Sequence, residues 1–191
     1  MKTLRLAYCL PTLAFACATS IAWGAPPVTA PGLPHFFQVT ENIYRGAQPT
    51  AQGWKSLKDL GVQVVIDLRR EGEDGEHSTK EEAKAVEALG MRYLHVPMSG
   101  MAAPTEAQIT KVLAELNSGK KVFVHCKKGK DRTGTVIACY RIKHQQWGNK
   151  KALGEAKSHG IHFVEFAMKN YISSYRGAEV AAAAAPTAVA Q

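Results

Sequence analysis

The strongest structural signal in this 191-residue chain is the stretch Lys121-Val122-Phe123-Val124-His125-Cys126-Lys127-Lys128-Gly129-Lys130-Asp131-Arg132-Thr133-Gly134. It opens as a β-branched, apolar run of the kind that forms a buried strand. A short loop follows, and from Thr133 to Trp147 the pattern is helical. A buried strand, a loop and a helix in this order indicate a sheet with helices packed against it.

The same alternation continues on both sides of this stretch. Two more buried strands are expected at 63–68 and 92–96, and further helices at 52–60, 78–89, 105–116, 150–159 and 163–175. Thr105 and Asn149 resemble helix N-caps. The residues expected on the apolar face of the last helix are Phe163, Phe166, Ala167, Ile172 and Tyr175. The sequence therefore predicts an α/β fold with a central, largely parallel sheet flanked by helices.

The loop between strand and helix has the composition of an anion-binding site. A tight loop at a helix start aims backbone N–H groups at one point, and the helix dipole adds positive potential there. Arg132 lies six positions after Cys126, and its planar fork can clamp two phosphate oxygens at once. The residues predicted to bind phosphate are Lys127, Lys128, Gly129, Lys130, Asp131 and Arg132.

Cys126 is the candidate nucleophile, because a positive loop stabilises the thiolate, which is the reactive form of cysteine. In this hypothesis Cys126 carries the phosphoryl group transiently. His125 is expected to hold the loop in register, and Thr133 to donate a hydrogen bond to the sulfur as it departs. Cys139 lies within an apolar helical run and is predicted to be a core residue.

These residues resemble the Cys-x5-Arg protein tyrosine phosphatase superfamily, in its compact dual-specificity branch. Its signature His-Cys-x5-Arg-Thr-Gly is matched at His125, Cys126, Arg132, Thr133 and Gly134. The resemblance runs from Phe36 to Tyr175 and includes Asn42-Ile43-Tyr44-Arg45-Gly46-Ala47-Gln48-Pro49. Together with the N-terminus described below, the layout is similar to periplasmic phosphatases of Gram-negative bacteria. Membership implies a two-step mechanism without a metal or other cofactor.

The general acid departs from the pattern of that family. Dual-specificity phosphatases carry an aspartate in the loop that here reads Met98-Ser99-Gly100-Met101-Ala102-Ala103-Pro104, which has no carboxylate. Asp131 is the best candidate, because Gly129 to Gly134 resembles bacterial lipid-and-tyrosine phosphatases, whose loop aspartate is thought to play this part. A structural role for Asp131, pairing with Lys128, Lys130 or Arg132, stays open. Glu106 and Asp74 are more distant candidates.

The two ends of the chain differ in composition from its middle. A charged start, an apolar run and the small residues Ala22 and Gly24 predict a secretory signal peptide over 1–24, and hence a periplasmic or secreted protein. An uncleaved anchor or a lipid-modified Cys17 are weaker alternatives. Residues 25–35 and the Ala-rich 177–191 are expected to be disordered tails around a catalytic domain at 36–176. No membrane-spanning segment is expected in the mature chain.

The charge of the chain and the spacing of its histidines limit which ligands and partners are expected. The net charge is +8 with 24 basic and 16 acidic residues, and cleavage after Gly24 removes only Lys2 and Arg5 of the charged residues. A basic chain favours anionic partners, but no aromatic-and-basic nucleic-acid motif is present, so nucleic acid is not expected. The histidines lack a metal-ligand spacing, and no metal is predicted.

Several functions remain open at this point. The leading one is hydrolysis of phosphorylated proteins by a tyrosine or dual-specificity phosphatase. Lys127, Lys128 and Lys130 also suit a phosphoinositide or inositol phosphate, although they are equally compatible with an ordinary solvated surface. A catalytically dead phosphate-binding module is less supported, since both Cys126 and Arg132 are present. Sulfur transfer of the rhodanese type also uses a cysteine in an anion loop, but the Arg-Thr-Gly ending favours phosphate esters.

Overall fold

The computed structural model describes residues 30–73 and 75–177. The predicted signal peptide and residues 178–191 of the predicted tail lie outside the described residues. The elements run in the order β1 (Phe37–Thr40), β2 (Ile43–Gly46), α1 (Ala51–Asp59), β3 (Val64–Asp67), α2 (Thr79–Ala88), β4 (Arg92–His95), α3 (Glu106–Leu116), β5 (Val122–His125), α4 (Asp131–Gln145), α5 (Asn149–Ser158) and α6 (Phe166–Ser174).

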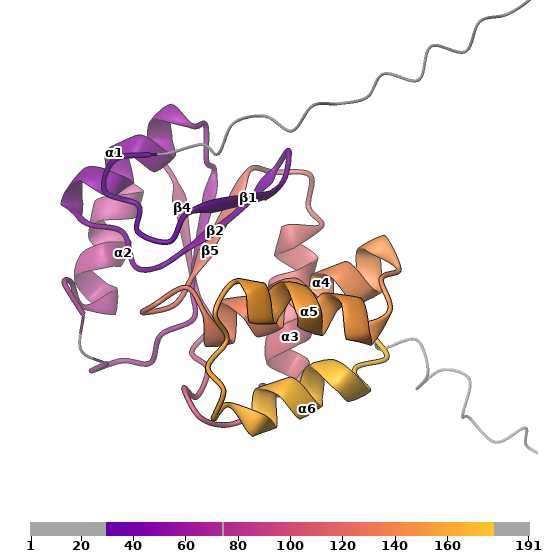
Figure 1. Ribbon diagram of the computed structural model, residues 1–191. Helices are drawn as coiled ribbons and strands as arrows, with labels where there is room; N and C mark the ends of the chain where they lie inside the picture. The colour runs from indigo at the N-terminus through magenta and orange to yellow at the C-terminus, as the bar shows by residue number, and fades with distance from the viewer. Residues whose placement is uncertain (1–29, 74, 178–191) are drawn as a thin grey trace, which may run out of the picture.

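The strands form one sheet in the order β1-β2-β5-β3-β4. β2, β5, β3 and β4 run parallel, and only β1 is antiparallel to its neighbour. Helices α1 and α2 cover one face, while α3 to α6 cover the other (Figure 1). The predicted fold class is confirmed. The sequence prediction missed β1 and β2, because β1 has only two apolar residues and β2 ends in an arginine and a glycine.

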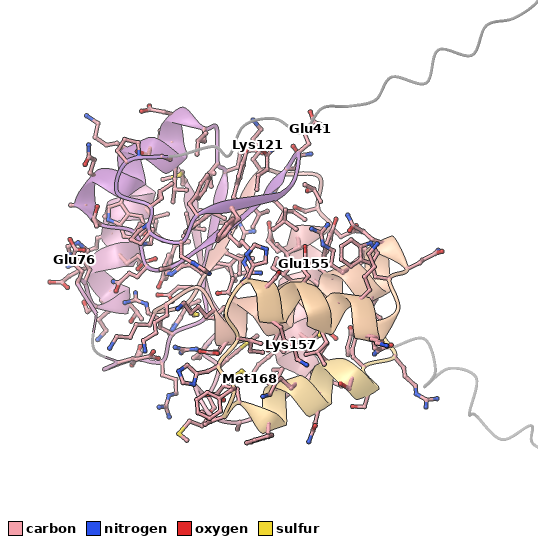
Figure 2. The ribbon with its side chains drawn as sticks, in the orientation of Figure 1. Glu41, Glu76, Lys121, Glu155, Lys157 and Met168 are labelled. Atoms are coloured by element: carbon pink, nitrogen blue, oxygen red, sulfur yellow. The ribbon has the colours of Figure 1, made fainter. Side chains whose placement is uncertain are left out.

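Each face of the sheet has its own apolar core. On the α1 and α2 face, Trp54, Leu57 and Val86 pack against Val65 and Phe123. On the other face, α3 and α4 contribute a cluster that contains Ile109, Val112, Leu113, Val136 and Ile137. A third cluster joins α4, α5 and α6, with Met168 directed from α6 toward α5 (Figure 2). These clusters fix the carboxyl ends of the strands relative to α4.

Some helix boundaries differ from the predicted ones. α4 begins at Asp131, two residues before the predicted start, so the loop is shorter than expected. The N-cap of α5 is Gly148, and Asn149 instead donates side-chain hydrogen bonds to the carbonyls of Ile172 and Tyr175. The prediction for Asn149 was therefore wrong. The capping box of Thr105 is confirmed.

The last helix starts later than predicted. α6 begins at Phe166, and Phe163 lies in the preceding turn. Both residues are solvent-exposed, at 75% and 65%, so the prediction that they lie on the apolar face was wrong. The prediction is confirmed for Ile172, which forms the buried face of α6 together with Met168.

The packed structure extends ahead of Phe36, where the predicted domain starts. Leu33 is buried, and the carbonyl of Gly32 accepts a hydrogen bond from the backbone of Thr50 at 2.9 Å. Part of the segment expected to be a disordered tail is therefore attached to α1. Among the described residues, no helix is long and apolar enough to cross a membrane.

Candidate active site

The carboxyl ends of the four parallel strands meet at one edge of the sheet. Gly46 and Asp67 lie on either side of His125, and His95 lies beside Asp67. Cys126 follows β5, which is the central strand, so it starts its loop with a strand on each side. This edge is where ligands bind in parallel α/β sheets.

A small cavity of about 260 Å³ opens at this edge. Its lining brings together five of the predicted site residues and one that was not predicted: Glu73, Cys126, Lys127, Lys128, Asp131 and Arg132. Lys130 is not in this lining, and its aliphatic stem lies against Gly160. A larger hollow of about 500 Å³, lined by Lys58, Arg92 and Lys120 among others, contains no nucleophile.

The carbonyl groups of the loop are held on the side away from the cavity. The carbonyl of Lys127 accepts from the backbone N–H of Gln48 at 3.2 Å, and that of Gly129 from Nη2 of Arg45 at 2.8 Å. The ring of His125 lies 3.3 Å from the carbonyl of Cys126. In a planar trans peptide the N–H points opposite to the C=O. The N–H groups that follow these carbonyls are therefore directed toward the cavity.

Gly129 makes this loop possible. Its φ of +69° lies in the left-handed region, which favours glycine. A Cβ at this position would overlap the backbone of Gly46 and Ala47. The loop is thus pressed against the end of β2, at the motif that the sequence placed near the start of the domain.

Arg132 is positioned by an acidic residue from another loop. Glu73 accepts two hydrogen bonds from its guanidinium, at 2.6 Å and 2.5 Å. Nε of Arg132 is buried and has no hydrogen-bond partner among the described residues. Burial alone would lower the pKa of Arg132, but the bonds to Glu73 and the nearby Cys126 thiolate raise it. The arginine is a fixed cation with one donor still free for a ligand.

Sequence reasoning missed Glu73. Burial favours its neutral form, but the hydrogen bonds from Arg132 outweigh this and hold its pKa below the usual range, so it is a carboxylate. The run Glu71-Gly72-Glu73-Asp74 follows β3, whose end lies beside the nucleophile strand. An acidic run directly after a strand of a parallel sheet could have indicated a residue of the active site, because ligands bind at that edge of the sheet.

Asp131 makes none of the predicted pairings with Lys128, Lys130 or Arg132 among the described residues. It lines the cavity, and its Oδ1 accepts a hydrogen bond from the backbone N–H of His162 at 2.6 Å. This bond ties the start of α4 to the turn before α6. Among the distant candidates for the acid, Glu106 accepts a bond from the hydroxyl of Tyr171, and Asp74 lies outside the described residues.

Thr133 and Cys139, which the sequence analysis singled out, are both buried in α4. Thr133 is fully buried, and its hydroxyl has no hydrogen-bond partner among the described residues. This hydroxyl is therefore free to bond to a sulfur or an oxyanion. Cys139 is also fully buried, and its environment raises the pKa of its thiol. Its core position agrees with the prediction.

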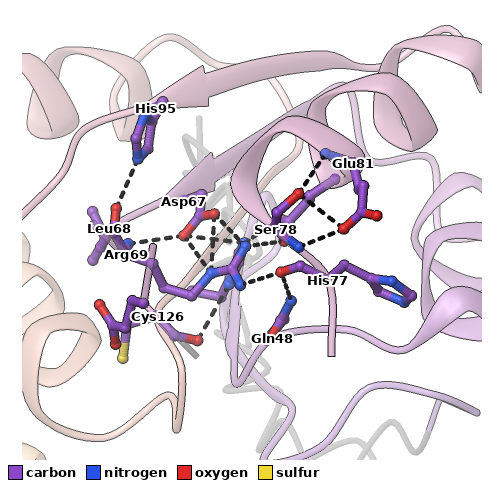
Figure 3. A network of polar contacts seen from close by, with 12 residues as sticks. Gln48, Asp67, Leu68, Arg69, His77, Ser78, Glu81, His95 and Cys126 are labelled. Carbon is purple, nitrogen blue, oxygen red and sulfur yellow. Dashed lines mark hydrogen bonds and ion pairs between the residues drawn. The ribbon is translucent and has the colours of Figure 1, made fainter. Parts of the chain in front are cut away.

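Behind the loop lies a buried network of charged groups (Figure 3). Arg69 binds both carboxylates, Asp67 at 2.7 Å and Glu82 at 2.6 Å, and all three side chains are inaccessible to solvent. Nε2 of His125 lies 2.6 Å from Glu82. Arg69 and Gln48 both donate to the carbonyl of His77, which attaches the loop after β3 to the same network. His125 is thereby fixed in the orientation in which it meets the carbonyl of Cys126.

Asp67, Glu82 and His125 are the one group of potential metal ligands in the described part of the chain. The carboxylates of Asp67 and Glu82 are already neutralised by two cations, the guanidinium of Arg69 and the imidazolium of His125. Burial would lower the pKa of His125, but Glu82 and Asp67 raise it to about 9. The prediction that the protein needs no metal stays a prediction.

This network predicts a pH dependence of stability. The folded pKa of His125, about 9, lies above the ordinary value of 6.5. The contribution of His125 to the free energy of unfolding is complete below its pKa in the unfolded chain. This contribution is lost as the pH rises through its pKa in the folded protein. The loss should be on the order of 3 kcal/mol of unfolding free energy. Melting temperatures from pH 6 to 10 for the wild type and His125→Gln test this, and equal pH slopes in both proteins would contradict it.

Comparison with known proteins agrees with this geometry. A family model described as "DSP-PTPase phosphatase fused to NAD+ Kinase" matches residues 37–174. The dual specificity protein phosphatase TpbA of Pseudomonas aeruginosa is 30% identical over 155 residues, which are 76% of this chain and 63% of TpbA. The phosphatidylglycerophosphate phosphatase PTPMT2 of Arabidopsis thaliana is 33% identical over 56% of this chain and 47% of its own length. The chain thus spans less than two thirds of these curated relatives.

The similarity extends to solved structures. The core catalytic domain of the PP-IP phosphatase SIW14 from S. cerevisiae superposes with a TM-score of 0.67 at 25% identity, covering 82% of this chain and 94% of that domain. The crystal structure of P. aeruginosa TpbA gives a TM-score of 0.64 over 78% of this chain and 89% of its own, at 24% identity, and supports the fold. The signature loop, the sheet edge and the family match together establish that this chain belongs to the DSP-PTPase phosphatases, the compact dual-specificity branch of the protein tyrosine phosphatase superfamily.

Proposed function

We propose that this chain hydrolyses phosphate monoesters through a cysteinyl-phosphate at Cys126, with phosphorylated proteins as its main substrates. The observation that carries this proposal is the shared cavity of Cys126 and Arg132, with the loop carbonyls held away from it. In the first step Sγ attacks phosphorus, the S–P bond forms, and the P–O ester bond breaks as the leaving oxygen takes a proton from the general acid. In the second step water attacks phosphorus and gives a proton back to that residue, the S–P bond breaks, inorganic phosphate is released and the thiolate is regenerated.

The cavity suits a phosphate ester whose remaining part extends into solvent. It has a volume of about 260 Å³ and contains the nucleophile and the arginine. Arg132 offers its free Nε, and Lys127 and Lys128 add positive charge at the rim. TpbA carries the name of a dual specificity protein phosphatase, which supports a phosphoprotein substrate. The predicted signal peptide over 1–24 supports action in the periplasm or outside the cell.

A second candidate substrate is an inositol phosphate or phosphoinositide. The observation that favours it is the pair of lysines, Lys127 and Lys128, in the cavity lining. Relatives named inositol diphosphatase DSP3 and PP-IP phosphatase SIW14 support the same class. A panel of phosphotyrosine, phosphoserine and phosphothreonine peptides, phosphoinositides and inositol phosphates tests both candidates. Phosphate release from none of them would contradict the proposed activity, and preference for inositol phosphates would replace the first candidate by the second.

Asp131 is the proposed general acid. It lines the cavity, and an alkoxide leaving from serine or threonine phosphate needs a proton. Asp131→Asn should slow esters with high-pKa leaving groups by about 10²-fold or more and largely spare activated aryl esters. The measurement is kcat/KM across a series of leaving groups.

The competing role for Asp131 makes a different prediction. If the bond to the backbone of His162 is its whole function, the asparagine variant still accepts that bond through its amide oxygen. Equal losses across all leaving groups, or an unchanged pH profile, would assign Asp131 to structure and leave the general acid to another residue.

A further inference from the structure

Arg45 of β2 lies beneath the phosphate loop and is only 1% exposed. Nη2 donates to the carbonyl of Gly129, whereas Nε and Nη1 are buried without a hydrogen-bond partner among the described residues. Its counterpart on the other face of the sheet, Arg69, binds two carboxylates. Burying a guanidinium without such partners is costly, so this arginine needs an explanation beyond stability.

The charged groups around Arg45 do not balance it. Glu155 of α5 is the main acidic neighbour (Figure 2), but its carboxylate is held by Arg141 in several hydrogen bonds at 2.7–3.2 Å. Arg141 itself repels Arg45. His35 and His159 lie nearby, and burial together with Arg45 lowers the pKa of both. Neither is then a cation at neutral pH, and neither supplies negative charge.

The remaining anionic neighbour is the nucleophile. Burial lowers the pKa of Arg45 to about 10, while Glu155 and the Cys126 thiolate act in the opposite direction. Arg45 therefore remains positively charged at neutral pH. Its guanidinium also lies near the first turn of α4, since a Cβ on Gly134 would be 3.7 Å from Nη2. Arg45 and the positive end of that helix face the loop from below, and Arg132 faces it from the cavity.

We propose that Arg45 is a positioning residue whose buried charge stabilises the Cys126 thiolate and the bound phosphoryl group from beneath the loop. Its bond to Gly129 holds that carbonyl away from the cavity, and its charge is compensated when an anion occupies the loop. The proposal rests on the proposed function, since it assumes that phosphate binds there. It also explains why an arginine occurs in the motif Ile43-Tyr44-Arg45-Gly46, where an apolar residue would pack at lower cost.

The test compares four proteins: the wild type, Arg45→Met, Arg45→Lys and the control Arg92→Met. The control removes a guanidinium that is paired with Glu115 at the start of β4, the end of the parallel strands that lies opposite to the loop. Two quantities are measured, the inhibition constant of inorganic phosphate and the pH dependence of Cys126 alkylation by iodoacetamide, mapped by mass spectrometry. Arg45→Met should weaken phosphate about tenfold and move the alkylation midpoint up by about one pH unit.

The other variants separate charge from packing. Arg45→Lys keeps the charge, so its alkylation midpoint should stay near that of the wild type, and Arg92→Met should change neither quantity. If Arg45→Met does not fold, a midpoint in Arg45→Lys that is shifted by a full unit would overturn the proposal. An unchanged profile in a folded Arg45→Met would do the same. A wild type that binds no phosphate would instead contradict the proposed function.

Discussion

Replacing Cys126 by serine is expected to abolish turnover of phosphate monoesters, by about 10⁴-fold or more, because a serine hydroxyl is not ionised at neutral pH. The loop N–H groups and Arg132 remain in this variant, so inorganic phosphate should still bind. Serine has nearly the shape of cysteine, and Cys126 is only 2% exposed, so the fold should be kept. The measurements are initial rates on aryl phosphates, phosphate affinity and the melting temperature.

Cys139 provides a matched control for this experiment. It is the other cysteine in the described part of the chain, and it is fully buried in α4. Cys139→Ser places a hydroxyl in the apolar core and should cost about 1–3 kcal/mol of stability while leaving kcat/KM within a few-fold of the wild type. Comparable activity in Cys126→Ser and the wild type would rule out Cys126 as the nucleophile.

Arg132→Ala is expected to lower kcat/KM by about 10³-fold and to weaken phosphate binding. The variant loses the guanidinium that lines the cavity and leaves the Glu73 carboxylate with only the backbone N–H of Arg70. An unpaired carboxylate in the phosphate cavity would repel the substrate dianion, which adds to the loss. Steady-state kinetics with an aryl phosphate and titration with inorganic phosphate measure both effects.

Arg132→Lys separates charge from shape. Lysine keeps the positive charge but cannot bond to Glu73 through two nitrogens and to phosphate through a third. We therefore expect activity close to that of Arg132→Ala. Recovery to within tenfold of the wild type would show that charge alone suffices and that the pairing with Glu73 has no part in catalysis.

The sequence was most informative where chemistry and local structure coincide. Cys126 and Arg132 lie at the two ends of a short, glycine-containing loop that leads into a helix N-terminus. Their spacing alone therefore predicted that they share one anion-binding cavity. The sheet followed from the apolar runs at 63–68 and 121–125. β1 was missed because it has only two apolar residues, Phe37 and Val39.

Residues that act across the fold could not be predicted in this way. Glu73 reaches Arg132 from a loop that is 59 positions away in the sequence. The burial of Arg45 could not be predicted, because it follows from the position of β2 between β1 and β5 in the sheet. Lys130 resembles its lysine neighbours in the sequence, but only the tertiary structure puts its stem against Gly160. Tertiary contacts decide these three cases, and local composition does not record them.

The close approach of Gly129 to Gly46 has a consequence for engineering. A library aimed at new substrate preference would randomise positions on this loop, and 127 and 128 are suitable because their side chains line the cavity. Position 129 is unsuitable for two reasons. Every side chain there would collide with the backbone at the end of β2, and the positive φ of this position would strain any residue other than glycine. Position 46 is constrained in turn by the ring of Phe123. Keeping both glycines fixed should raise the fraction of folded clones without narrowing the range of substrates that can be selected.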